Sequence, residues 1–121
     1  MSKICTSIKQ SQKLIELGIN VNTADMDYIP FANDPKNYDC VINIYNNEHE
    51  DNWIPAWSLS ALLELIPDII EDYVLRIDKV YGEYYIWYGE GWSDNMAHTS
   101  SENFIDAAFE MVVWLKENNK I

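Results

Sequence analysis

Hydrophobic residues in the middle of the chain recur with the period of a helix. Between Ser58 and Pro67, four apolar side chains stand at i, i+3, i+4 and i+7, so they share one face. Ser58 is suited to the N-cap, and Pro67 ends the helix because proline has no N–H. About two turns of helix are unstable alone in water, so we expect this face to be packed. The four residues are Leu59, Leu62, Leu63 and Ile66.

The first half of the chain is predicted to contain a helix over residues 6–18 and two strands. Ser7, with a glutamine three residues later, fits a capping box at the start of this helix. Residues 24–29 alternate weakly between apolar and polar, which indicates an edge strand with one solvent-exposed face. Residues 39–45 indicate a strand more strongly. The predicted connections, rich in polar and turn-forming residues, are 31–38 and 46–52.

After the central helix, the pattern predicts an antiparallel meander. Residues 73–78 alternate between apolar and polar, and residues 84–88 are dense in residues that favour strands. The link between these segments contains Gly82 and is short enough for a hairpin. Residues 95–98 are expected to add a short third strand.

The chain is predicted to close with a helix. Ser100 or Ser101 is expected to cap its N-terminus, and Asn118 and Asn119 are expected to end it. Apolar residues at helical spacing form its predicted core stripe. That stripe consists of Ile105, Ala108, Phe109, Val112 and Leu115.

These elements predict the α+β class, with an antiparallel sheet of three to five strands and about three helices packed on one face. The chain has 121 residues, which is the usual size of a single domain and enough to bury one core. We therefore expect one α+β domain over residues 1–121.

The charge of the chain limits its partners. Twenty acidic residues against eight basic ones give a formal net charge of −12. Nucleic acids are polyanions, and the sequence has no concentrated basic patch, so direct nucleic-acid binding is not expected. Anionic membrane surfaces are disfavoured for the same reason. A basic protein partner is compatible with this charge, and so is plain solubility.

The cysteines and the apolar runs indicate the compartment. Cys5 and Cys40 do not form a metal-like pair, and we expect Cys40 to be a small buried residue and Cys5 a thiol in the N-terminal tail. No leader opens the chain, and no apolar run approaches 18 residues. These features predict a reduced, cytoplasmic protein that does not enter membranes.

Candidate chemistry is sparse. Asp25 and Asp27 would share one face of a strand, where such a pair sometimes holds a metal, and His49 lies in an acidic loop. Neither His49 nor His98 has a Cys or a second His at the spacing of metal ligands, and the acidic residues around His49 favour a solvated loop over a cation site. A small hydrolytic or metal-dependent enzyme that uses these four residues is one alternative, and it requires two of the groups to lie within about 4 Å of each other. No catalytic residue, metal ligand or cofactor is assigned.

Large aromatic side chains occupy both faces of the strand at residues 84–88. Helices on one side of a sheet bury only one of its faces, so the other face would expose Tyr85 and Trp87. These two residues and Trp92 are the candidates for a binding surface. The alternative is that a loop, such as residues 30–38 or 46–56, covers this face.

Several long segments of the chain are distinctive. They are Leu14–Met26, Ile54–Pro67, Tyr73–Asp78 and Ser101–Asn118. These segments resemble small uncharacterised proteins from phages and mobile elements of gut anaerobic bacteria. The resemblance covers most of the chain except the region from Tyr28 to Asn52. It implies a bacterial cytoplasm and an accessory role, and it carries no assigned activity or catalytic residue.

The function expected from these observations is non-enzymatic protein binding. An exposed aromatic and acidic surface would contact a protein partner of unknown identity, and an inhibitor of a host protein is one form of such a module. An acidic surface that imitates DNA is a sharper version of this idea. Besides the enzyme, the remaining alternative is a structural homodimer that pairs through a free strand edge or the aromatic face.

Overall fold

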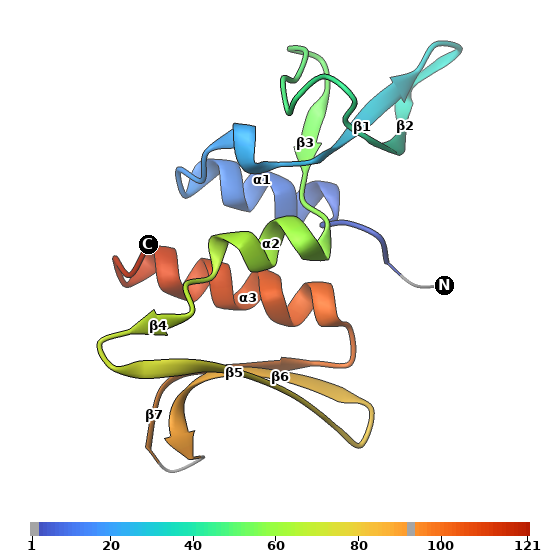
Figure 1. Cartoon of the computed structure of the whole chain (residues 1–121). Coiled ribbons are helices and arrows are strands. Elements are labelled where there is room, and N and C mark those ends of the chain that lie inside the picture. Colours follow the sequence, from blue (N-terminus) through green and yellow to red (C-terminus); the bar gives the residue numbers. More distant parts are fainter. Residues whose placement is uncertain (1–2, 92–93) are drawn as a thin grey trace. The chain divides into compact units, whose positions relative to one another are not determined.

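The computed structural model describes residues 3–91 and 94–121, which form two compact units that meet in the sequence at Ala61 and Leu62. In these residues there are three α-helices and two antiparallel sheets, one of three strands and one of four (Figure 1). The predicted α+β class is confirmed. The strands, however, are divided between two sheets instead of forming the one that the sequence predicted. The single domain stays a prediction.

The first unit contains a helix and the three-stranded sheet. Its elements are α1 (Ile8–Glu16), β1 (Met26–Phe31), β2 (Asp34–Ile42) and β3 (Ile54–Ala56). The strand order is β2-β1-β3, and both pairings are antiparallel. The predicted capping box of α1 is confirmed, because the Ser7 hydroxyl accepts the N–H of the third helical residue, whose side chain accepts the Ser7 N–H in return.

The position of β1 corrects two predictions. This strand lies in the centre of its sheet and not at an edge, and its Asp27 is fully buried where a wet face was expected. The predicted loop over 31–38 is also wrong, because β1 continues through Pro30 and β2 already begins at Asp34. Proline is tolerated at this point because it borders an irregularity in the β1–β2 register.

The central helix α2 (Leu59–Leu65) spans the point in the sequence where the two units meet. The predicted cap is confirmed, since the Ser58 hydroxyl accepts the backbone N–H of Ala61 at 3.2 Å. On the predicted apolar face, Leu62 and Ile66 are buried, and the other two residues are half-buried.

The second unit contains the four-stranded sheet and the last helix. Its elements are β4 (Ile69–Ile70), β5 (Tyr73–Val80), β6 (Glu83–Gly91), β7 (Asp94–Ser101) and α3 (Phe104–Glu117). The strands follow the order β4-β5-β6-β7, which is the predicted meander. Figure 1 shows α3 lying along this sheet. In the described parts of the chain, no helix has both the length and the apolar character that crossing a bilayer requires.

One face of the second sheet packs against α3. The ring of Tyr84 stacks on Phe104 with 4.6 Å between centroids, and the Thr99 hydroxyl donates to the carbonyl of Ala107. The cap of α3 corrects a prediction: Asn103 caps the helix, because Ser100 and Ser101 are still paired with β6. Phe109 is only half-buried. The buried residues of α3 are Ile105, Ala107, Ala108, Met111, Val112 and Leu115.

Candidate functional site: a buried Asp–His pair beneath an acidic aromatic loop

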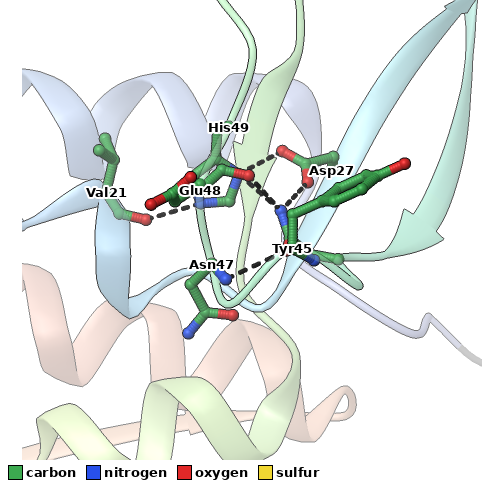
Figure 2. A network of polar contacts seen from close by, with 7 residues as sticks. Val21, Asp27, Tyr45, Asn47, Glu48 and His49 are labelled. Atoms are coloured by element: carbon green, nitrogen blue, oxygen red, sulfur yellow. Dashed lines mark hydrogen bonds and ion pairs between the residues drawn. The ribbon is translucent and has the colours of Figure 1, made fainter.

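The centre of the first sheet carries a buried Asp–His pair. Asp27 points from β1 toward the loop that follows β2, and there its carboxylate contacts Nδ1 of His49 (Figure 2). The other imidazole nitrogen, Nε2, lies 2.9 Å from the carbonyl oxygen of Val21. The side chains are 1% exposed for Asp27 and 5% for His49, so both groups are almost completely removed from water.

The partners of His49 determine where its protons lie. A carbonyl oxygen only accepts hydrogen bonds, so Nε2 carries a hydrogen and donates it to Val21. Nδ1 and the carboxylate of Asp27 share the second proton in a charge-assisted hydrogen bond. The buried carboxylate is thereby compensated, which a group so far from water requires.

This contact meets the distance condition for the enzyme alternative, but the chemistry of the pair does not fit a catalytic base. In a hydrolytic triad, the carboxylate orients one imidazole nitrogen and the other nitrogen faces the nucleophile. In this chain the second nitrogen faces Val21 and has no free lone pair. The pair therefore acts as a structural link between β1 and the loop.

The other candidate residues of that alternative contact other partners. Asp25 accepts hydrogen bonds from the backbone N–H and hydroxyl of Ser58, so its carboxylate is directed to the start of α2. His98 lies on β7 in the second unit and stacks on Tyr85. Across residues 3–91 and 94–121, no three His, Cys, Asp or Glu side chains gather as metal ligands would.

A single amide side chain fixes the loop above the pair. The amino group of Asn43 donates to Asp27 at 2.7 Å and to the carbonyl of Glu48 at 2.8 Å. Its carbonyl accepts the backbone N–H groups of Tyr45 and Asn47 at 2.7 and 3.1 Å. The Asn43 side chain thus takes the place of the backbone hydrogen bonds between strands, which stop where β2 ends. Figure 2 shows this network, with Tyr45, Asn47 and Glu48 around it.

The loop fixed in this way forms a small pocket of about 220 Å³. The rings of Tyr45 and Trp53 face it with centroids 6.0 Å apart and planes inclined at 34°. Glu48 and Glu50 supply two exposed carboxylates. Aromatic faces and carboxylates both attract cations, so the pocket is suited to a positively charged group.

The sequence predicted only a polar connection over residues 46–52, so this pocket was not expected. Two aromatic residues, Tyr45 and Trp53, flank the acidic run in the sequence, and they were the available signal. The closure of the loop depends on Asp27, which lies 22 residues before His49. No local pattern reveals that pairing.

The residues that the sequence proposed for binding lie in the second unit. Tyr85 and Trp87 are on the face of the sheet opposite α3. Trp87 is only 6% exposed and donates its indole N–H to Asp78 at 3.1 Å, whereas Tyr85 is half-buried. Trp92 lies outside the described residues. A binding role for these three residues stays a prediction.

Comparison of the chain with protein-family models, curated proteins and solved structures gave no match.

Proposed function

We propose that this protein is a non-enzymatic binding module whose 43–53 loop receives a basic side chain, lysine or arginine, of a protein partner. The observation that carries the proposal is the pocket of about 220 Å³ lined by two aromatic residues, two glutamates and His49, whose ring is compensated by Asp27. The formal charge of −12 favours approach of a basic partner over long range.

The loop is organised before any ligand arrives, which supports a binding role. The side chains of Asn43 and His49 fix it through hydrogen bonds, and Asn46 and Asn47 adopt left-handed backbone conformations with φ of 55° and 61°. A preformed site loses little conformational entropy when it binds, so more of the interaction energy appears as affinity.

The expected contribution of one basic side chain is modest. A cation over an aromatic face contributes about 0.5–2 kcal/mol, and an exposed ion pair contributes about 0.2–1 kcal/mol. A free arginine side chain should therefore bind with a dissociation constant in the millimolar range or weaker. A protein partner would add contacts around the rim.

The test uses a short neutral-ended peptide with one arginine and its counterpart with citrulline, which has the same shape without the charge. Binding is followed by the NMR shift of the Trp53 indole N–H. We expect the arginine peptide to bind at least fivefold more tightly. Replacing Glu48 and Glu50 with glutamine should weaken it about fivefold, because the carboxylates are lost and the rings remain.

The matched control removes the same charge elsewhere. Glu102 and Glu117 are exposed residues of the second unit, and their double replacement by glutamine should change the affinity less than twofold. Equal binding of both peptides, or equal weakening by both double variants, would refute a specific pocket. In host lysate, a partner that is captured by the wild type and control but lost from the pocket variant would support the proposal.

The resemblance to phage and mobile-element proteins favours a host protein as the partner and inhibition as the outcome. This part of the proposal is tested separately, by assaying the captured protein with and without the module. Pairing of two copies through a strand edge is the competing role, and light scattering at two concentrations tests it. A stable dimer that binds neither peptide would favour the structural alternative.

A further inference from the structure

Two cysteines that are distant in the sequence meet on the first sheet. The Sγ atoms of Cys5 and Cys40 lie 2.6 Å apart, although 35 residues separate them. Sulfur atoms in a disulfide are about 2.05 Å apart, so a bond between them requires only a small further approach. Both cysteines are in the thiol form in this structure.

The sheet holds both sulfurs in place. Cys40 on β2 pairs across the sheet with Tyr28 on β1, and the Tyr28 hydroxyl lies 3.4 Å from Sγ of Cys5. The segment that carries Cys5 is tied to the end of β3, because Thr6 donates its N–H to the carbonyl of Trp57 and accepts the Trp57 N–H. The two thiols are therefore positioned by elements that are fixed independently of them.

The two sulfurs differ in access and in acidity. Cys5 is 2% exposed, whereas Cys40 lines an open, mostly apolar groove of about 640 Å³. A hydrogen bond from the Cys40 thiol lowers the pKa of Cys5 to about 7, and the same bond raises the pKa of Cys40. The pair thus loses its first proton near neutral pH and retains the second.

We propose that Cys5 and Cys40 form a thiol–disulfide site that low-molecular-weight disulfides, such as oxidised glutathione, convert to an intramolecular disulfide. The bond links the segment before α1 to β2. The site lies on the face of β1 that carries Met26 and Tyr28, opposite the face that carries Asp27, so it is independent of the binding pocket.

The reaction proceeds in two exchanges. As the remaining proton moves to Cys5, the Cys40 sulfur attacks one sulfur of oxidised glutathione, forms a mixed disulfide and releases one glutathione thiolate. Cys5 then gives up its proton to solvent and its thiolate attacks the Cys40 sulfur. The bond between Cys40 and glutathione breaks, and the second glutathione leaves as a thiolate. Each released glutathione thiolate can take up a proton from solvent. The two cysteines lose two electrons and two protons, and oxidised glutathione takes up both.

The test begins with the reduced, full-length wild type and oxidised glutathione. We expect the intact mass to fall by two hydrogen atoms, both thiols to disappear, and a non-reducing peptide map to join Cys5 to Cys40. Dithiothreitol should reverse the change. Because only the wild type is needed, this measurement does not depend on the folding of any variant.

Two variants test the order of attack. In Cys5→Ser, the reaction should stop at one glutathione attached to Cys40. In Cys40→Ser, attachment to the buried Cys5 should be at least tenfold slower. Wild-type protein that keeps both thiols, accumulates glutathione adducts, or links two chains would overturn the proposal. The proposal would also be overturned if the Cys5–Cys40 disulfide formed no faster in the native protein than in the urea-unfolded protein.

Discussion

Removal of His49 should destabilise the first unit strongly, and removal of the charge on Asp27 should restore part of the loss. In His49→Ala, the carboxylate stays buried but loses its charged partner, and Val21 loses its donor. A buried charge-assisted hydrogen bond contributes about 1.5–3 kcal/mol, and the uncompensated carboxylate adds to the cost. We expect a total loss of about 3–5 kcal/mol in the free energy of unfolding, as for other broken buried pairs.

Asp27→Asn should be tolerated much better. The new amide can donate to Nδ1 of a neutral His49, and its oxygen can still accept from Asn43. Every buried polar group then keeps a partner, so we expect a cost of about 1 kcal/mol or less. The double variant Asp27→Asn/His49→Ala should be about 1–3 kcal/mol more stable than His49→Ala alone, because it no longer buries an unpaired charge.

The assay is urea unfolding followed by circular dichroism, with amide exchange of residues 43–53 to report on the first unit. His98→Ala is the control, since this histidine is exposed and should cost about 1 kcal/mol or less. The reasoning is refuted if His49→Ala unfolds at the same urea concentration as His98→Ala. It is also refuted if the double variant is less stable than the His49→Ala single variant.

Three further predictions concern the cysteine pair and the β5–β6 turn. The disulfide between Cys5 and Cys40 closes a long loop in the unfolded chain, so oxidised protein should be about 4 kcal/mol more stable in guanidinium unfolding than reduced protein. The hydrogen bond from Cys40 lowers the pKa of Cys5 to about 7. The rate of oxidation by glutathione should therefore fall about tenfold per pH unit below about pH 7 and become constant above it. A rate–pH profile with its midpoint near about pH 9 would contradict this hydrogen bond between the two thiols. At the β5–β6 turn, φ is +50° at Tyr81 and +80° at Gly82. Gly82→Ala should lower the free energy of unfolding by about 1–2 kcal/mol, because a side chain is strained at this φ. Tyr81→Asn should raise it by a few tenths of a kcal/mol, and thermal unfolding measures both changes.

Local patterns predicted several of the elements and their ends. The capping box at Ser7, the stop at Asn118 and the meander from Tyr73 onward all depend on residues within a few positions of one another. The cap of α3 was misplaced by two or three residues, because Ser100 and Ser101 are as suitable chemically as Asn103. What decided the position was the pairing of the two serines with β6, which is not a local property.

The long-range contacts could not be predicted from the sequence. The alternation around Asp27 predicted the face of the strand on which its carboxylate lies, but it could not show that a loop would cover that face. An aspartate that is buried by a distant histidine has the same local pattern as an aspartate in water. The meeting of Cys5 and Cys40 has the same origin, because it follows from the strand order and not from the spacing of the residues.

The four hydrogen bonds of Asn43 also limit which substitutions the chain can accept. Acidic residues are common in this sequence, yet an aspartate at this position would be electrostatically prohibited. Exchange of its amino group for an oxygen would turn two donated bonds into repulsions, one against Asp27 and one against the carbonyl of Glu48. Hydrolytic deamidation of Asn43 would produce the same aspartate, so the folded loop persists only as long as this amide is not hydrolysed.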